Sequence, residues 1–374
     1  MRIAINTRFL LSSKMEGFGW YTFEVVKRLV EQHPEHEFIL FFDRPIDKKF
    51  VFGNNATNVV LNPPARHPIL FYIWFEFSVK RALKKYKADV FLSPDGYLSL
   101  KSDVKQIAVI HDINFEHNPG DIPRLMRKYL CHFFPKFAQK ASHILTVSEY
   151  SKQDICTTYK IAQEKVTVAW NGASSAFKPL EENQKIAVRT ERTAGKPYFL
   201  FVGALHPRKN VGRLIQAFEI FKRENPTDEH KLVIVGSELF GNRLGEVTIS
   251  PFIKAHLIFT GHVSLTDLAN IMGAASLFTY VPYFEGFGIP LVEAMKCGTP
   301  ILSGDRTSLP EVAGEAAIYC DPYNTKEISE KMSLIASSPQ LRTELSQKGL
   351  KRSELFSWNN TATKVWDVIC KVIH

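Results

Sequence analysis

Glu285 and Glu293 are the two residues whose types and spacing most clearly indicate chemistry. Both lie in residues 281–300, VPYFEGFGIPLVEAMKCGTP, where Glu285 precedes a glycine-rich turn and Glu293 lies in the helix that this turn is expected to open. Carboxylates accept hydrogen bonds from hydroxyl groups, and Glu293 is placed to reach a second set of hydroxyls further along a ligand. The alternatives are an acid/base pair, or a capped helix whose surface carries one ion-paired glutamate.

The loop between the two glutamates is expected to expose backbone N–H groups. Gly286 and Gly288 permit a sharp turn and a close approach of the backbone to a ligand, and the proline that follows is tolerated in a first helical turn. Residues 286–289, which include Phe287 and Ile289, then present N–H groups at the positive end of a helix dipole. Such a loop favours a ligand that is negatively charged or rich in hydroxyl groups.

A second candidate site is basic. Gly203 follows the apolar run 198–202 and opens a loop that carries Arg208 and Lys209. The helix expected over residues 211–223 can hold an anion at its N-terminus. A forked guanidinium beside an ammonium group suits a diphosphate better than a single carboxylate. The pair therefore predicts a diphosphate site, and the alternative is a solvated basic pair on the surface.

His111 and Asp112 form a third candidate, because they follow the expected strand 106–110. The carboxyl ends of parallel strands are where ligand-binding residues gather. The alternative for His111 is a histidine packed under a loop. Ser148 follows the next expected strand, and it is expected to cap a helix over residues 149–159.

Gly17 and Gly19 follow the first expected strand, residues 2–6, and precede a helical pattern that runs from Trp20 to about residue 31. The arrangement of strand, glycine turn and helix opens many nucleotide-binding folds. The full GxGxxG pattern is absent, so the segment is a poor dinucleotide fingerprint. We expect a loop whose amides face a ligand, with a purely structural turn as the alternative.

The candidate residues above follow expected strands, so a parallel sheet is needed to bring them together. Strand and helix patterns alternate along the chain, as such a sheet requires. Strands are expected at residues 2–6, 37–42, 58–62, 89–93, 106–110, 142–147 and 166–169, and again at 198–202, 231–235, 257–260, 276–280, 300–303 and 317–319. Apolar runs of this length, separated by helical patterns, are typical of strands buried in parallel sheets. The sequence therefore predicts an α/β fold with two doubly wound, Rossmann-like sheets.

Length and pattern together divide the chain. Its 374 residues are too many for one ordinary core. Residues 173–196 lose hydrophobic periodicity. We therefore expect an N-terminal domain over 1–175, a linker over 176–196, a C-terminal domain over 197–355, and a last helix over 356–374 that packs back towards the N-terminal domain.

Composition excludes several classes of protein. Hydrophobic residues make up 45% of the chain and charged residues 23%, as in a soluble globular protein. The five cysteines show no spacing typical of zinc ligands, and a reducing, cytoplasmic setting is expected. The start of the chain predicts no leader segment, and no run is apolar enough to span a bilayer. The net charge of +9 favours anionic partners, which include nucleic acid, an acidic membrane or a phosphorylated substrate.

Two expected helices combine aromatic and basic residues. Residues 70–87 are aromatic in the first half and basic in the second, and residues 123–140 mix phenylalanine with lysine and arginine. Such helices can lie on an anionic membrane surface, which would place the protein peripherally on the inner face of the cytoplasmic membrane. The alternative is a helix that packs its aromatic residues into the core and solvates its basic ones.

Several motifs, in order along nearly the whole chain, resemble those of the retaining GT-B glycosyltransferases of family 4. The most specific are EGFGIPLVEAMKCGTPIL (285–302) with SLPEVAGEAA (308–317), FVGALHPRKN (201–210) and IFTGHVS (258–264). GFGWYT (17–22), HD (111–112), VSEYS (147–151) and WNG (170–172) match more loosely, and resemble the mannosyltransferase-like members. The segment before the glycines, with Lys14, Met15 and Glu16, departs from the family pattern, so the resemblance does not define the acceptor.

The resemblance implies a nucleotide-diphospho-sugar donor in a cleft between two facing Rossmann-like domains, with the acceptor on the first. It assigns the diphosphate to Arg208 and Lys209, the sugar hydroxyls to Glu285 and residues 286–289, and the ribose to Glu293. It further assigns the base to His262 and Val263, a sugar contact to His111, and a close approach of the loops to Gly17, Gly19 and Gly203, with Asp112 and Ser148 as acceptor-side candidates.

The expected reaction is transfer of a hexosyl unit, mannosyl from GDP-mannose first, to a glycan or lipid-linked acceptor in polysaccharide or lipopolysaccharide synthesis. Retention of configuration follows from the resemblance. The chain has no Asp-x-Asp, so no metal or other cofactor is expected and the two cations take the metal's role. A UDP-sugar such as UDP-glucose or UDP-GlcNAc is the alternative donor. The function of a dinucleotide-dependent oxidoreductase is not supported, because the chain lacks the dinucleotide fingerprint. A nucleic-acid-binding function is supported by the positive charge alone.

Overall fold

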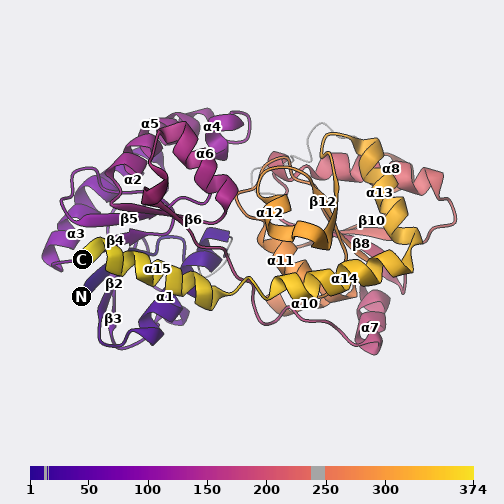
Figure 1. The fold of residues 1–374 in the computed structure, drawn as a ribbon, viewed down its shortest axis with the longest axis horizontal. Helices are drawn as coiled ribbons and strands as arrows, with labels where there is room; N and C mark the ends of the chain where they lie inside the picture. Colours follow the sequence, from indigo (N-terminus) through magenta and orange to yellow (C-terminus); the bar gives the residue numbers. More distant parts are fainter. Residues whose placement is uncertain (12–14, 16, 237–248) are drawn as a thin grey trace. The chain divides into compact units, whose positions relative to one another are not determined.

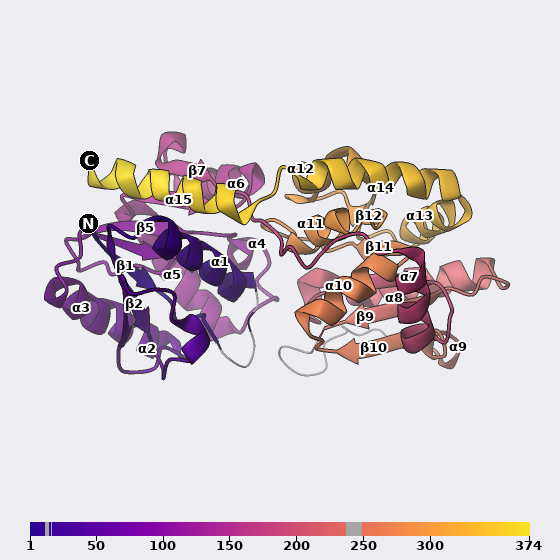
Figure 2. The same ribbon diagram turned by 90° about the horizontal axis from the view of Figure 1, so that it is seen from below.

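The computed structural model describes residues 1–11, 15, 17–236 and 249–374, and these form two compact units (Figure 1). The first unit comprises Met1–Gly172 and Ser357–His374, and the second comprises Ala173–Phe356. Each unit is a parallel β-sheet with helices on its faces (Figures 1 and 2). The chain therefore has the α/β architecture of two Rossmann-like sheets that the sequence predicts.

The first unit contains a seven-stranded sheet in the order β3-β2-β1-β4-β5-β6-β7, and every pair is parallel. Its strands are β1 (Arg2–Asn6), β2 (Glu37–Phe42), β3 (Ala56–Val60), β4 (Val90–Ser93), β5 (Lys105–Val109), β6 (His143–Thr146) and β7 (Val166–Val168). The central strands are almost continuously buried, because helices cover both faces of a parallel sheet. The carboxyl ends of β1, β4 and β5 therefore share one edge.

The helices of the first unit lie on both faces of this sheet. They are α1 (Gly17–Gln32), α2 (Pro68–Ile73), α3 (Lys80–Lys85), α4 (Asn114–His117), α5 (Arg124–Lys140), α6 (Glu149–Tyr159) and α15 (Trp358–Ile373). Helix α1 buries a stripe that includes Tyr21, Val25 and Leu29, which recur at the spacing of a helix face. Helix α15 lies beside α1 and also contacts β4, β5 and β6 (Figure 1).

The second unit contains a six-stranded parallel sheet in the order β10-β9-β8-β11-β12-β13. Its strands are β8 (Tyr198–Val202), β9 (Lys231–Val235), β10 (Leu257–Gly261), β11 (Leu277–Tyr280), β12 (Ile301–Gly304) and β13 (Ala317–Cys320). The chain order reverses direction at β8, where β9 lies on one side and β11 on the other. Ligands of open α/β sheets bind outside the carboxyl ends of the strands at such a switch point.

Helices also cover both faces of the second sheet. They are α7 (Glu182–Thr193), α8 (Val211–Glu224), α9 (Pro251–Lys254), α10 (Leu265–Ala274), α11 (Ile289–Lys296), α12 (Leu309–Ala313), α13 (Thr325–Ser337) and α14 (Pro339–Ser353). Helix α8 packs against α13, whereas α10 packs against α7 and α11, and α11 packs against α14. These two groups of helices bury the hydrophobic strands between them.

The expected linker over residues 176–196 is not an unstructured connection. Most of it is helix α7, which begins with a capping box between Glu181 and Gln184 and packs against α10 of the second unit. Its residues are mostly polar because only a narrow face of the helix is covered, so the sequence shows little hydrophobic periodicity. The chain instead passes between the units at Gly172–Ala173 and at Phe356–Ser357.

Three local expectations in the first unit are corrected by the structure. Helix α1 begins at Gly17 rather than at Trp20, so both glycines lie in its first turn instead of in a preceding loop. Strand β3 spans Ala56–Val60, two residues earlier than expected, because its register follows β2. The helix expected over 70–87 is helical without a break from residue 68 to residue 85, and its middle, Trp74–Val79 between α2 and α3, is π-helical.

Candidate functional site

The carboxyl edge of the second sheet gathers most of the predicted site residues. Gly203 follows β8, Glu285 lies shortly after β11, and His262 follows β10. Arg208 and Lys209 end a short 3-10 turn that precedes helix α8. Because β8 and β11 are neighbours, the Lys209 loop and the Glu285 loop lie side by side. Two stretches far apart in sequence thus form one polar cluster.

Lys209 and Glu285 are in direct contact within this cluster. The Lys209 ammonium group donates a hydrogen bond to Glu285 Oε1, and its Nζ lies 2.6 Å from the Tyr280 hydroxyl oxygen. The two charged side chains are 13% and 8% exposed, so the pair is largely shielded from water. A cation and a carboxylate that neutralise each other near the surface can exchange partners when an anionic, hydroxyl-bearing ligand arrives.

The segment that follows β12 holds the backbone of Glu285 from both sides. Glu285 N donates to Thr307 Oγ1 at 3.2 Å, and Ser308 Oγ donates to Glu285 O at 2.9 Å. Ser308 is fully buried. Sequence reasoning found the SLPEVAG motif but gave it no physical role, and these two contacts provide one.

Asn210 fixes the loop that carries the two cations. It adopts a left-handed backbone conformation with φ of 60° at the start of α8, and its side chain is buried. Its Nδ2 donates to Val281 O at 3.0 Å and to Pro322 O at 2.6 Å. The side chain therefore ties the Arg208–Lys209 loop to the carboxyl ends of β11 and β13. Asparagine is one of the few residues that tolerate a left-handed backbone conformation. An asparagine directly before the expected helix is therefore the sequence signal for this role.

Helix α11 begins immediately after the glycine-rich loop, as the sequence predicts. Gly288 precedes it with φ of 94°, a left-handed conformation that favours glycine, and proline occupies its first turn. Residues 286–289 therefore lie at the positive end of the α11 dipole. This arrangement favours negative charge in front of the loop.

Glu293 lies in α11 in surroundings that disfavour its charge. Burial raises the pKa of its carboxyl group to about 8. A neutral carboxylic acid both donates and accepts hydrogen bonds, which suits a pair of neighbouring hydroxyl groups. Glu285, one turn before the helix, has Lys209 as a counter-ion, whereas Glu293 forms no ion pair with the other residues that the structure describes. Burial therefore favours the neutral form of Glu293.

Other predicted residues lie on the same edge at different distances from this cluster. Arg208 is close enough to lower the pKa of the Tyr280 hydroxyl, opposing the stronger effects of burial and Glu285. His262 and Val263 lie between β10 and helix α10, whose N-cap is Ser264. Strand β10 is separated from β8 by β9, so these residues lie further along the edge.

In the first unit, His111 follows β5 and is held by contacts on several sides. Its Nε2 lies 2.9 Å from Pro94 O, and its ring packs edge-on against Phe18 and Tyr21 of α1. Burial lowers the pKa of His111, an effect that the Pro94 carbonyl and Asp112 oppose. The neutral ring therefore carries its proton on Nε2, and Nδ1 is the nitrogen with an available lone pair.

The remaining predicted residues of the first unit have local structural roles. Asp112 Oδ1 accepts from Asn114 N at 3.0 Å. Ser148 caps α6, with its Oγ accepting from Ser151 N at 3.0 Å, as expected. Gly17 and Gly19 lie in the first turn of α1, while Lys14 and Glu16 lie outside the described residues.

A buried ionic cluster in the first unit was not predicted. Arg8 follows β1 and is 4% exposed, with its guanidinium group over the rings of Phe71 and Tyr97. Its Nε lies 2.5 Å from Asp95 Oδ2. The Asp95 turn also contributes the Pro94 carbonyl that holds His111. The cluster therefore links the ends of β1 and β4 to the predicted site histidine.

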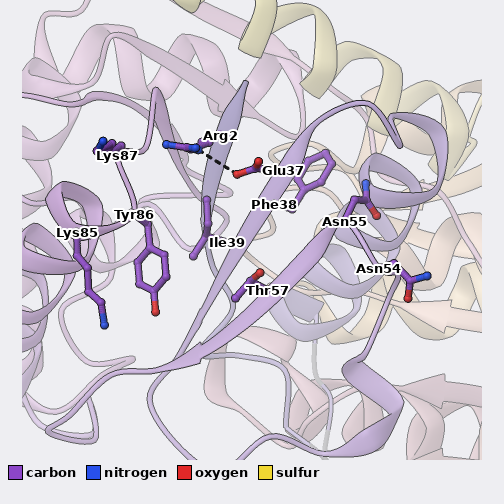
Figure 3. Close-up of a pocket in the computed structure, with 10 residues that line it drawn as sticks. All are labelled: Arg2, Glu37, Phe38, Ile39, Asn54, Asn55, Thr57, Lys85, Tyr86 and Lys87. Atoms are coloured by element: carbon purple, nitrogen blue, oxygen red, sulfur yellow. Dashed lines mark hydrogen bonds and ion pairs between the residues drawn. The ribbon is translucent and has the colours of Figure 1, made fainter.

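A groove of about 510 Å³ lies at the opposite edge of the first sheet (Figure 3). It is lined by the amino ends of β1 and β2, the start of β3 and the end of α3. Arg2 and Glu37 face each other across two of these strands, with 2.9 Å between Nε and Oε2 (Figure 3). Because ligands of parallel sheets gather at the carboxyl edge, this groove is separate from the candidate site.

The two aromatic and basic helical regions divide between core and surface. Phe71, Trp74 and Phe75 are buried, as are Phe134 and Phe137, so these rings pack in the core. A remaining group stays near the surface and forms what we call the aromatic–basic face: Tyr72, Phe77, Lys101, Phe133 and Lys136. Lys101 Nζ lies 5.4 Å and 5.3 Å from the ring centroids of Tyr72 and Phe77, and Lys136 Nζ lies 5.5 Å from that of Phe133.

In the described part of the chain, no helix has the length and hydropathy needed to cross a bilayer.

Both halves of the chain match models of known protein families. Residues 15–177 match Glycosyltransferase Family 4, and residues 182–352 match Glycosyl transferases group 1. The boundary between the matches coincides with the region where the chain passes from the first unit to the second.

Individual relatives agree with these matches. The chain is 28% identical over 366 residues to the O-antigen chain mannosyltransferase B of Escherichia coli, covering 94% of each chain. It is 26% identical over 274 residues to the O-antigen chain mannosyltransferase RfbU of Salmonella typhimurium, covering 73% of this chain and 72% of the other. The structure of HepE from Anabaena, solved in complex with UDP and glucose, superposes with a TM-score of 0.78 over 99% of both chains at 16% identity. At that identity the structural likeness shows a shared fold.

Proposed function

This chain belongs to the family 4 glycosyltransferases of the GT-B fold, and on that premise we propose that it transfers a mannosyl unit from GDP-mannose to a glycan or lipid-linked acceptor in polysaccharide or lipopolysaccharide synthesis. The observation that carries the proposal is the contact of Lys209 with Glu285 at the carboxyl edge of the second sheet. A diphosphate and a sugar ring present the two chemistries that this pair recognises, an anion and a set of hydroxyl groups. The mannosyltransferases among the relatives support the choice of sugar and pathway.

The proposed roles follow from the charges. Arg208 and Lys209 bind the donor diphosphate and stabilise the negative charge that grows on it as it leaves. Glu285 accepts hydrogen bonds from sugar hydroxyls once Lys209 has turned to the diphosphate. Glu293 holds the ribose diol, and His262 and Val263 lie where the base is expected. His111 hydrogen-bonds the sugar through Nδ1, because its Nε2 is engaged with Pro94 O.

We propose that the configuration at the anomeric carbon is retained by a same-face reaction. The bond from the anomeric carbon to the diphosphate oxygen breaks while a bond to the acceptor oxygen forms on the same face. The acceptor hydroxyl proton passes to the leaving diphosphate. The two carboxylates take no part as nucleophile and acid, since both are assigned to donor hydroxyls, and the spacing rule for hydrolases does not apply to them.

A donor panel tests the proposal. The purified chain is incubated with GDP-mannose, UDP-glucose and UDP-GlcNAc, and the release of nucleoside diphosphate and the shift of the melting temperature are measured. We expect slow hydrolysis and thermal stabilisation with one donor, GDP-mannose. A preference for a UDP-sugar would support the glycosyltransferase reaction but would show that GDP-mannose is not the donor. Indifference to every nucleotide sugar would sink the proposed reaction.

Two further arms of the same assay test the remaining expectations. We propose that no divalent cation is required, because Arg208 and Lys209 supply the charge that a metal supplies elsewhere. Turnover is then unchanged by EDTA, and restoration by Mg²⁺ or Mn²⁺ after its loss contradicts the proposal. We also propose no role in nucleic-acid binding. Strongly salt-dependent DNA binding that nucleotide sugars do not compete would contradict this.

The aromatic–basic face supports a further proposal, peripheral contact of the first unit with an anionic membrane. Phe77 is 42% exposed, and Ile69 and Leu125 on the neighbouring helices are 65% and 57% exposed. The Glu76 carboxylate accepts from Leu100 N at 2.7 Å and Lys101 N at 3.0 Å, which fixes the turn that presents Lys101. Exposed rings among lysines suit the interface of an anionic bilayer, where a lipid-linked acceptor would lie.

A further inference from the structure

Tyr280 ends strand β11 and lies beneath the Lys209–Glu285 pair, although its sequence position gives it no obvious role. The side chain is fully buried, and its ring lies against Phe278 and Phe201, with centroid distances of 5.6 Å and 6.3 Å. Phe278 and Phe201 belong to neighbouring strands of the second sheet. The ring is therefore fixed by the rigid centre of the sheet, and its hydroxyl group has a fixed position at the sheet edge.

The hydroxyl group contacts both members of the pair. Lys209 Nζ lies 2.6 Å from the Tyr280 oxygen, and the Glu285 carboxylate is close enough to help raise the pKa of the Tyr280 hydroxyl group. Lys209 Nζ additionally lies 5.2 Å from the centroid of the Tyr280 ring. A hydroxyl group is both donor and acceptor, so it can accept from the ammonium group and donate to the carboxylate at the same time.

We propose that Tyr280 is a positioning residue, which holds the side chains of Lys209 and Glu285 in the arrangement that binds the donor. Its hydroxyl group remains hydrogen-bonded to Lys209 when Glu285 turns to the sugar. The inference rests on the proposed function for its consequence in catalysis. Lys209 ends a flexible four-carbon stem, so its ammonium group depends on fixed acceptors for its position. Glu285 is one such acceptor in this structure, and the buried hydroxyl group of Tyr280 is a second.

The matched control is Tyr198, another buried tyrosine of the same sheet. Its hydroxyl donates to Ile271 O at 2.6 Å, and it lies at the amino end of β8, away from the site. Tyr280→Phe and Tyr198→Phe each remove one buried, hydrogen-bonded hydroxyl group and keep the ring. We expect kcat for the donor to fall about 10- to 100-fold in Tyr280→Phe, with the donor KM within about threefold of wild type. Tyr198→Phe is expected to keep the wild-type kcat, and wild-type kcat in Tyr280→Phe would overturn the inference.

A double-mutant cycle makes the inference independent of the reaction. Wild type, Tyr280→Phe, Lys209→Met and the double variant are compared by melting temperature without ligand, and by turnover with the active donor. If Tyr280 acts through Lys209, the effects are non-additive in both measurements. Additive changes in melting temperature overturn the inference. Absence of turnover in wild type refutes the proposed function instead, and the melting-temperature cycle still decides the role of Tyr280.

Discussion

Arg8 and Asp95 form an ion pair inside the first unit, with 2.5 Å between Arg8 Nε and Asp95 Oδ2 and both side chains less than 5% exposed. Breaking a buried pair leaves one charge uncompensated, which costs about 3–5 kcal/mol. We expect Asp95→Asn to lower the free energy of unfolding by about that amount in urea titrations.

The exposed pair of Arg2 and Glu37 supplies the control for this prediction. Their side chains are 44% and 68% exposed, and such pairs contribute about 1 kcal/mol or less. Glu37→Gln should therefore leave the unfolding curve nearly unchanged. Equal effects of the two substitutions would show that the Arg8 cluster is as well solvated as a surface pair.

Glu285→Gln tests the separation of sugar contacts from nucleotide contacts. The substitution removes the negative charge that faces Lys209 and weakens hydrogen bonds to sugar hydroxyls. We expect kcat to fall about 100-fold or more, with the affinity for the nucleoside diphosphate within about threefold of wild type, as measured by steady-state kinetics and calorimetry. Glu315→Gln, at an exposed position of the same unit, is the control. Equal losses of turnover and nucleotide affinity would assign Glu285 to the nucleotide.

Glu293 predicts a specific dependence of stability on pH. Its folded-state pKa of about 8 lies above its ordinary value, so between those two values the unfolded state binds fewer protons than the folded state. The contribution of this group to stability is therefore full at low pH and is lost as the pH rises towards 8. We expect Glu293→Gln to match wild type in urea unfolding at pH 5 and to exceed it at pH 8.5. A constant difference between the two proteins across this range would contradict the raised pKa.

Gly17 and Gly19 predict opposite responses to the same substitution. A Cβ at Gly19 would lie 2.8 Å from Phe9 O, whereas one at Gly17 meets no described atom within 4 Å. Alanine in an exposed helical turn costs less than glycine, so Gly17→Ala should keep or raise the melting temperature and Gly19→Ala should lower it. The family resemblance implies that the backbone at Gly17 approaches a substrate closely, and on that expectation Gly17→Ala should still weaken donor binding although the residue lies in the first turn of α1. Unchanged donor affinity in that stable variant would leave Gly17 as a helix residue alone.

The aromatic–basic face predicts salt-sensitive binding to anionic vesicles. Lys101→Glu with Lys136→Glu reverses two charges on this face, and each lysine near such a surface contributes about 1 kcal/mol. We expect at least about a tenfold loss of binding in flotation with phosphatidylglycerol vesicles. Lys254→Glu with Lys326→Glu reverses two charges of the second unit and should have little effect. Unchanged flotation of the first variant would count against membrane contact through this face.

Strand positions and the ends of several helices were predictable from local sequence. Strands β1, β2, β8 and β9 span the expected residues, because each is an apolar run bounded by polar or turn-forming residues. Helix α7 was not predicted, because its sequence is mostly polar and lacks the hydrophobic periodicity that indicates a helix. Its composition is that of a linker. The start of α1 was missed because glycine in a first turn reads as a loop.

The sequence by itself determined the alternation of strands and helices, the motifs of the family, and the presence of cations and carboxylates at the carboxyl ends of strands. The tertiary structure alone decided the partners of those groups: Tyr280 beneath Lys209, Thr307 and Ser308 around Glu285, and Arg8 beside Asp95. Local patterns follow from neighbours along the chain, whereas these partners lie tens of residues apart and meet only through the order of the strands. The charge state of Glu293 likewise depends on how much water the folded chain removes from its carboxyl group, which its position in the sequence does not specify.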